Sequence, residues 1–155
     1  MSLPLPEPFL YFRGNWQLER EIFTKSTGTL QAKASGVASF RLSEAGNSLR
    51  YQEKGKVKLT GSGSELGFTR RFRYDFRGQG LHIFFDDGPD AGSFYQAYIY
   101  DPGTQKLVAE QVHVCGPDLY QGAYLLTNEN SFFHFTTIEG KAKDMLIKTR
   151  YTRSI

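Results

Sequence analysis

Hydrophobic and polar side chains alternate along much of this chain, which is the pattern of β-strands that pack on one face. In residues 49–59 the odd positions are Leu, Tyr, Glu, Gly, Val and Leu, and the even positions are Arg, Gln and three lysines. The alternation returns in residues 68–76, where one face is formed by Phe68, Arg70, Phe72, Tyr74 and Phe76. Residues 60–65 between them are rich in glycine and serine, so the pattern predicts a hairpin.

Similar patterns predict further strands near residues 15–25, 34–42, 80–86, 93–100, 107–115, 119–127, 131–139 and 143–153. Most of the gaps between them hold glycine, proline, asparagine or aspartate and are too short for a parallel crossover, so neighbouring strands should be antiparallel. About ten such strands would leave exposed edges unless the sheet closes on itself. We therefore predict an all-β fold, a single closed up-and-down antiparallel β-barrel of about ten strands.

Length and composition agree with this fold. We expect residues 1–155 to form one barrel domain, in which residues 1–12 are an irregular segment able to hold a short helical turn. Aromatic residues make up 15% of the chain and 16 residues are glycine, a balance that favours strands and tight turns over helices.

Charge and cysteine content exclude several classes of function. The formal net charge of +3 is small and spread along the chain, so it does not by itself indicate nucleic-acid binding. One cysteine and three histidines allow no intrachain disulfide and favour no metal site. No apolar stretch approaches the ~18 residues of a membrane span. The first residues do not resemble a secretory signal, so we expect a cytoplasmic protein.

The two ends of the predicted barrel carry a recognisable pattern. Gly14-Asn15-Trp16 begins the first strand, and Arg150 and Arg153 lie in the last one. This arrangement resembles the calycins, the group of lipocalins, fatty-acid-binding proteins and nitrobindin-like barrels. The resemblance implies that the strand near Trp16 pairs with the strand near Tyr151 and that an arginine of the last strand packs on the indole. Only one of the two arginines can face inward, and we predict Arg150.

A longer series of motifs is similar to a small family of unknown function. They are Phe12-Arg13-Gly14-Asn15-Trp16, Leu49-x-Tyr51-x-Glu53-x-Gly55, Arg70-x-Phe72-x-Tyr74, Phe84-Phe85-Asp86-Asp87-Gly88, His113-x-Cys115-x-x-Asp118-Leu119-Tyr120 and Gly140-x-x-Lys143-Asp144. The resemblance covers residues 12–153 and implies a barrel with a cavity but no particular reaction. Nitrobindin-like barrels bind haem through a late histidine. The last strand here has none, so we expect no haem and no other cofactor.

Glu53 is the first candidate for chemistry in the cavity. It shares the packed face of its strand with Tyr51 and Val57, where a carboxylate needs a partner. If Leu59 pairs with Leu66 across the hairpin, Arg70 becomes the diagonal neighbour of Glu53. We therefore predict that Glu53 and Arg70 both point into the barrel and share a hydrogen bond. Such a pair can anchor a ligand or be a structural ion pair, and the pattern leaves both open.

Residues 113–120 form the second candidate. A strand end, a Gly-Pro turn and a strand start should gather His113, Cys115, Asp118 and Tyr120 at one rim. A nucleophilic cysteine is not favoured, because no orienting residue accompanies the Cys-His pair. We expect Asp118 to be a turn residue and His113 and Tyr120 to line the cavity.

A basic outer face raises the alternative of nucleic-acid binding. Lys54, Lys56 and Lys58 share the exposed face of one strand, and Arg71 and Arg73 share that of the next. The neighbouring aromatic residues, Phe72 and Tyr74, have the opposite parity and cannot stack on bases. Outward lysines that keep a sheet soluble are the simpler interpretation.

Together these patterns predict a barrel that binds a small organic or lipid-like, hydrophobic or amphipathic ligand. We expect the ligand to contact Tyr51, Glu53, Arg70, Phe72, His113, Tyr120 and Tyr124, and Gly14, Trp16 and Arg150 to close the barrel. No contact with nucleic acid or membrane is expected, and a homodimer is left open. Two alternatives are an enzyme that uses Glu53 and His113 as acid and base, and a solid barrel that acts as a protein-interaction module. A void of ~300 Å³ or more would favour ligand binding.

Overall fold

A computed structural model describes residues 5–44 and 46–154 and contains one short helix and eleven strands. The elements are α1 (Pro8–Phe12), β1 (Gly14–Thr24), β2 (Thr29–Leu42), β3 (Ser48–Leu59), β4 (Glu65–Arg77), β5 (Gly80–Phe85), β6 (Phe94–Asp101), β7 (Lys106–Ala109), β8 (His113–Cys115), β9 (Asp118–Asn128), β10 (Ser131–Glu139) and β11 (Asp144–Arg153). No helix in these two ranges is long and apolar enough to cross a membrane.

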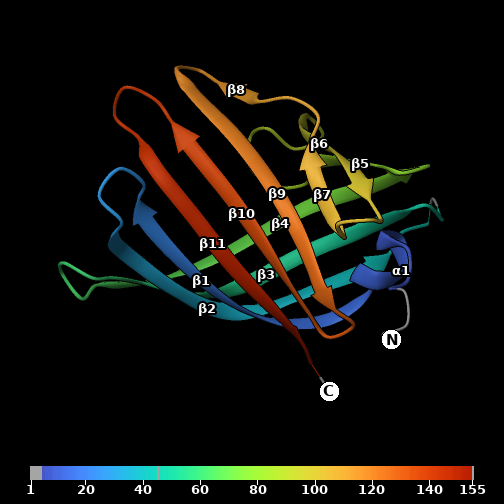
Figure 1. The fold of residues 1–155 in the computed structure, drawn as a ribbon. Coiled ribbons are helices and arrows are strands. Elements are labelled where there is room, and N and C mark those ends of the chain that lie inside the picture. The colour runs from blue at the N-terminus through green and yellow to red at the C-terminus, as the bar shows by residue number, and fades with distance from the viewer. Residues whose placement is uncertain (1–4, 45, 155) are drawn as a thin grey trace.

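The strands form a closed antiparallel barrel of ten strands, as the alternation predicts (Figure 1). Each strand pairs with its neighbour in the chain from β1 to β7, then β7 pairs with β9, β9 with β10, β10 with β11, and β11 with β1. Strand β8 lies outside this ring and pairs with the start of β9 only. Helix α1 lies at the end of the barrel away from β8 (Figure 1).

The barrel closes between β1 and β11, where Trp16 pairs with Arg153 and Leu18 with Tyr151. This confirms the predicted pairing of the strands near Trp16 and Tyr151. The prediction of Arg150 as the stacking residue is wrong. The Arg153 guanidinium lies 4.1 Å from the centre of the Trp16 ring, whereas Arg150 is exposed on the outer surface. Arg153 has the same parity as the buried Tyr151, and Arg150 has the opposite one.

Arg153 also ties the N-terminal segment to the barrel. Its side chain donates hydrogen bonds to the backbone carbonyls of Tyr11, Arg13 and Glu129, at distances of 2.8 to 3.1 Å. Gly14, with a φ of +118°, allows the chain to turn from α1 into β1 at this point. A hydrogen bond of 2.8 Å from the Trp16 indole to the Phe12 carbonyl fixes the same junction.

Aromatic side chains fill the α1 end of the barrel. Tyr11, Phe12, Trp16, Phe40 and Phe132 are each at most 2% exposed, and their rings lie edge-to-face or stacked on one another. Phe12 is at the centre, with its ring 5.0 Å from Phe132 and 5.1 Å from Phe40. The barrel is therefore closed at this end, and any interior space must lie further toward β8.

Two local features differ from the predicted strands. The predicted strand 107–115 is divided into β7, which belongs to the barrel, and β8, which forms a hairpin with β9 across Gly116 and Pro117. Strand β2 begins at Thr29, five residues earlier than predicted. In the N-terminal segment, residues 8–12 form α1, the short helical turn that the sequence allowed, and residues 1–4 lie outside the described residues.

Candidate functional site

Between the aromatic plug and β8, the barrel encloses a cavity of about 450 Å³. Its walls come mainly from the inward faces of β1, β3, β4, β9, β10 and β11. All seven side chains that the sequence suggested for ligand contact line it: Tyr51, Glu53, Arg70, Phe72, His113, Tyr120 and Tyr124. At about 450 Å³ the cavity exceeds the ~300 Å³ that favours ligand binding, so the barrel is not filled.

Hydrogen-bonded tyrosines form the deep wall of the cavity. The Tyr51 and Tyr151 hydroxyls lie 2.8 Å apart, and those of Tyr74 and Tyr124 lie 2.7 Å apart. All four side chains are buried. Burial raises the pKa of each phenol, that of Tyr151 to about 12, so the hydroxyls stay protonated at neutral pH.

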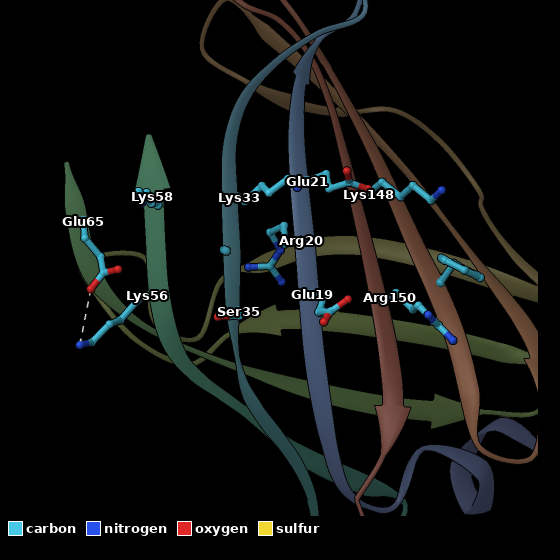
Figure 2. A pocket seen from close by; sticks show the side chains of 12 residues that line it. Glu19, Arg20, Glu21, Lys33, Ser35, Lys56, Lys58, Glu65, Lys148 and Arg150 are labelled. Carbon is cyan, nitrogen blue, oxygen red and sulfur yellow. Dashed lines mark ion pairs between the residues drawn. The ribbon is translucent and has the colours of Figure 1, made fainter. Parts of the chain in front are cut away.

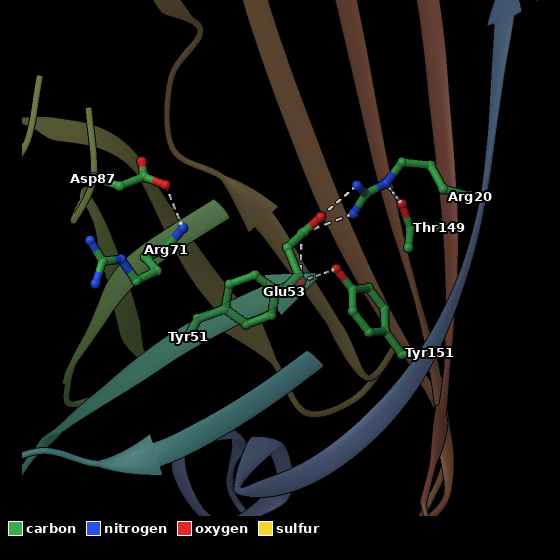
Figure 3. Close-up of polar contacts among 7 residues, drawn as sticks. All are labelled: Arg20, Tyr51, Glu53, Arg71, Asp87, Thr149 and Tyr151. Atoms are coloured by element: carbon green, nitrogen blue, oxygen red, sulfur yellow. Dashed lines mark hydrogen bonds and ion pairs between the residues drawn. The ribbon is translucent and has the colours of Figure 1, made fainter. Parts of the chain in front are cut away.

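A charged group stands beside these tyrosines. Arg20 of β1 and Glu53 of β3 form a two-pronged ion pair, with Nη1–Oε2 at 2.7 Å and Nη2–Oε1 at 3.1 Å (Figure 3). The Arg20 Nε donates to the Thr149 hydroxyl at 2.8 Å, and the Tyr51 hydroxyl donates to Glu53 Oε1 at 2.7 Å. Both partners of the ion pair are therefore fixed by further hydrogen bonds.

The Arg20–Glu53 pair is charged at neutral pH. Burial alone would raise the pKa of Glu53, but the hydrogen bonds and positive charge of Arg20 outweigh it, and the pKa is lowered. Burial alone would lower the pKa of the Arg20 guanidinium, but the hydrogen bonds and negative charge of Glu53 outweigh burial, and the pKa is raised. Glu53 is thus an ionised acceptor and not a proton donor in the folded protein.

The predicted hydrogen bond between Glu53 and Arg70 is wrong. Val57, not Leu59, pairs with Leu66, so the hairpin register differs by two residues from the expected one and Arg70 lies directly opposite Glu53. A shift of two residues keeps every side chain on its predicted face, and both residues line the cavity. The Glu53 carboxylate binds Arg20 instead, while the Arg70 guanidinium lies 5.0 Å from the centre of the Phe72 ring.

Aromatic rings surround the cavity near β8. Phe72 stacks on Tyr95 with ring centres 5.6 Å apart, Phe85 lies 4.9 Å from Tyr95, and His113 lies 5.1 Å from Tyr95 and 6.0 Å from Tyr120. Burial raises the pKa of Tyr95 to about 12 and lowers that of His113. This rim therefore consists of flat, uncharged rings at neutral pH, with Arg70 beside them.

The thiol of Cys115 has no arrangement for nucleophilic catalysis. It is exposed, and within the described ranges no hydrogen bond joins it to His113. Asp118 forms an ion pair of 3.3 Å with Lys143 and is not only a turn residue. No group of three or more histidine, cysteine or acidic side chains that could hold a metal ion is present among the residues that the structure describes.

Several interior residues are not among those predicted from the sequence to contact a ligand: Arg20, Tyr98, His134, Thr149 and Tyr151. The His134 ring stacks on Tyr124 with centres 4.1 Å apart, and part of its surface faces the cavity. Burial, with a smaller effect of the nearby Arg20 charge, lowers its pKa to about 3. Gly122 provides the space here, because a Cβ at this position would lie 2.3 Å from the Tyr98 hydroxyl.

A second hollow, of about 710 Å³, lies on the outer surface of the barrel between β1–β4 and β10–β11 (Figure 2). Its charges alternate: Glu21 lies between Lys33 and Lys148 in the sheet register, and Glu19 lies opposite Arg150. Lys56 and Glu65 form an ion pair of 3.6 Å. The lining of this hollow is basic overall, because Arg20, Lys33, Lys56, Lys58, Lys148 and Arg150 outnumber Glu19, Glu21 and Glu65. Most of these charges are exposed and screened by solvent, so the interior cavity is the better candidate site.

Comparison with known families and structures identifies the family of the chain and proteins of similar fold. Residues 12–153 match the family described as a family of unknown function, DUF6314. The chain belongs to this family. A search of curated proteins found no match.

Two solved structures show the fold of this DUF6314 protein in other chains. One is an S-type phycobiliprotein lyase from Guillardia theta, with a TM-score of 0.67, 9% identity and coverage of 95% of this chain and 90% of the other. The second, from Nostoc punctiforme, is a protein of unknown function of the DUF3598 family. Its TM-score is 0.60 and its identity 12%, with coverage of 94% of this chain and 49% of the other. At these identities the likeness is one of fold alone.

Proposed function

We propose that this DUF6314 protein binds a small organic or lipid-like molecule inside its barrel. The observation that carries the proposal is the interior cavity of about 450 Å³. Ligand pockets in proteins measure roughly 300–1,000 Å³ and combine apolar or aromatic walls with a few fixed polar groups. Phe72, Tyr124 and Ile147 supply such walls, and Glu53 and Arg20 supply polar groups held in one geometry.

The seven residues predicted from the sequence have distinct parts in this proposal. Phe72, Tyr120 and Tyr124 offer ring faces, and His113 offers a neutral imidazole near the rim. Tyr51 and Glu53 act mainly by holding Arg20 and Tyr151 in place. Arg70 is the charged group at the rim. The fold likeness to a phycobiliprotein lyase supports a barrel of this type, while the proposal for this chain rests on its own cavity.

The two alternatives from the sequence have less support. An enzyme using Glu53 as an acid needs a protonated carboxyl group, whereas Arg20 keeps this one ionised. As a base Glu53 would need a free oxygen, whereas Arg20 and Tyr51 already bind both of its oxygens. A solid barrel that acts only as an interaction module needs a filled interior, which the cavity contradicts. The cytoplasmic location and the absence of nucleic-acid and membrane contacts stay predictions, and so does the open question of a homodimer.

A pair of tryptophan variants tests the proposal with a neutral aromatic probe, N-phenyl-1-naphthylamine. Ile147→Trp places the largest side chain in the cavity, and Leu146→Trp makes the same kind of change at the neighbouring position, whose side chain does not line it. We expect saturable binding to the wild-type protein, at least about tenfold weaker binding to Ile147→Trp, which is a loss of about 1.4 kcal/mol, and little change in Leu146→Trp.

Circular dichroism and thermal unfolding must show that both tryptophan variants are folded. If the wild-type protein does not bind the probe, or if a folded Ile147→Trp variant binds it as well as the wild type does, the interior cavity is not the binding site.

A further inference from the structure

The rim of the cavity carries a positive charge, that of the exposed Arg70, which no other side chain of the described residues pairs with. None of the six ion pairs and none of the side-chain hydrogen bonds among the described residues involves the Arg70 guanidinium. Glu53, its cross-strand neighbour, binds Arg20 with both oxygens. The remaining acid in the lining, Asp90, is exposed and forms no ion pair with Arg70.

Arg70 is exposed, but it also lines the cavity, and its guanidinium lies over an aromatic ring of the cavity wall. Strand β5 pairs with β4 only from Phe72 onward, so Arg70 lies just beyond the last β5 partner, at the rim. Its guanidinium lies 5.0 Å from the centre of the Phe72 ring, and the Phe72 ring stacks on Tyr95. The charge of Arg70 also lowers the pKa values of Glu53 and Tyr95, although other effects decide the final value for Tyr95.

The other charges in the cavity do not compete for an anion. Arg20 and Glu53 neutralise one another in a two-pronged pair. Burial lowers the pKa values of His113 and His134, so neither imidazole is charged at neutral pH. Arg70 is therefore the cationic group available to a ligand, and it stands next to the flat rings of Phe72, Phe85 and Tyr95.

We propose that the ligand is an organic anion, an aromatic or conjugated molecule whose carboxylate or similar acidic group binds the Arg70 guanidinium at the rim. This inference rests on the proposed function and specifies its ligand class. The guanidinium offers a planar fork of N–H donors that matches the two oxygens of a carboxylate. The ring system of such a ligand would lie between the aromatic side chains deeper in the cavity.

Two probes with one ring system test the proposal. N-phenyl-1-naphthylamine is neutral, and 8-anilinonaphthalene-1-sulfonate carries the same rings with one negative charge. The variants are Arg70→Gln and, as a matched control, Arg71→Gln. Both arginines are exposed, but Arg71 does not line the cavity. The Arg71 contact with Asp87 is made by the backbone N–H, so the control substitution leaves it intact (Figure 3).

We expect Arg70→Gln to weaken binding of the sulfonate probe by about tenfold or more, as the loss of a charge-assisted hydrogen bond does. Binding of the neutral probe should change by less than about twofold, and Arg71→Gln should leave both probes unaffected. Arg70→Lys keeps the charge without the planar fork, so its affinity for the sulfonate should lie between those of the wild type and Arg70→Gln.

The outcomes separate this inference from the proposed function. If Arg70→Gln leaves sulfonate binding unchanged, or weakens binding of both probes equally, Arg70 does not select an anion. The proposed function still holds in that case, provided that the wild-type protein binds the neutral probe. If the wild-type protein binds neither probe, the proposed function itself fails. If Arg70→Gln is unfolded, Arg70→Lys decides, and sulfonate binding equal to that of the wild type overturns the role of the guanidinium fork.

Discussion

Arg20 and Glu53 are joined by two hydrogen bonds although their strands are not neighbours in the sheet. Arg20 lies on β1 and Glu53 on β3, with β2 between them. The β2 and β3 residues that pair near this contact are small: Ala34, Gly36, Ala38 and Gly55. Because no large side chain stands in between, the long arginine side chain can cross the inner face of β2 and reach the carboxylate.

This ion pair should be important for stability. Replacing Arg20 with methionine would leave the Glu53 carboxylate, which is only 5% exposed, without its counter-ion. Removing one partner of a buried pair typically costs about 3–5 kcal/mol in the free energy of unfolding. We expect a loss of this size for Arg20→Met, measured by urea denaturation at pH 7.

Arg70→Gln is the matched control for this prediction, since Arg70 lines the same cavity and forms no ion pair with Glu53. It should change the free energy of unfolding by less than about 1 kcal/mol. Equal losses in Arg20→Met and Arg70→Gln would show that the two arginines share the carboxylate in solution.

His134 should make stability depend on pH. Its pKa is lowered by burial from 6.5 to about 3, so between these values the unfolded chain holds a proton that the folded chain lacks. The free energy of unfolding should then fall by up to about 1.4 kcal/mol for each pH unit below about 6.5. The pKa of Glu53 is also lowered, so its contribution is lost only at lower pH, as the pH falls through the folded pKa below 4.5.

A His134→Phe variant isolates the contribution of His134. It keeps a ring that can stack on Tyr124 and removes the titrating group. The free energy of unfolding, measured by urea denaturation between pH 6 and pH 5, should depend less steeply on pH in this variant. Its slope against pH should be smaller than that of the wild type by about 1 kcal/mol per pH unit. Identical slopes for the two proteins would mean that His134 is not buried in its neutral form.

The contact between Trp16 and Arg153 gives a third prediction. Trp16 is fully buried, so Trp16→Ala should cost about 3–5 kcal/mol in the free energy of unfolding. Arg153→Ala removes the stacking and the hydrogen bonds to three backbone carbonyls, and should cost about 2 kcal/mol or more. Arg150→Ala, on the same strand but exposed, should be within about 0.5 kcal/mol of the wild type, and the reverse order of the two arginine variants would contradict this closure.

Gly36 and Gly55 give a fourth prediction, about the close approach of the paired strands β2 and β3. They are opposite each other, and a Cβ on Gly36 would lie 2.2 Å from the Lys54 carbonyl oxygen and 2.7 Å from the Gly55 Cα. These are backbone atoms, which cannot move aside as a flexible side chain can, so Gly36→Ala should cost at least about 2 kcal/mol. Gly61→Ala, which meets nothing within 4 Å, should be neutral. Equal thermal unfolding of the two variants would argue against this close approach.

Much of the fold follows from local patterns. The period-2 alternation gives the strands and their inward faces. It correctly puts Tyr51, Glu53 and Arg70 on the face that lines the cavity, with Arg70 at its exposed rim. The hairpin register was predicted two residues out, because the glycine- and serine-rich loop does not fix its own length. Parity survives such a shift, whereas the identity of the cross-strand partner does not.

The contacts that define the cavity were harder to predict. The partner of Glu53 comes from a strand that is not adjacent, so a rule for neighbouring strands cannot find it. The sequence nonetheless holds a usable signal. Arg20 shares its strand face with Leu18 and Ile22, and Arg153 shares its face with Tyr151 and Thr149, which places both arginines on inward faces. A burial pattern in the sequence shows which side a residue faces, but the distances across a closed barrel depend on its full geometry.

Methyl NMR during titration with N-phenyl-1-naphthylamine tests most directly whether the ligand binds inside the barrel. The isoleucines Ile22, Ile83, Ile138 and Ile147 line the cavity, and Ile99, which is 50% exposed, lies on the outer surface. We expect large, saturable shifts of the methyl signals from these four interior isoleucines and none for Ile99. Shifts confined to Ile99 and other exposed methyl groups, with the interior ones unchanged, would contradict binding in the cavity.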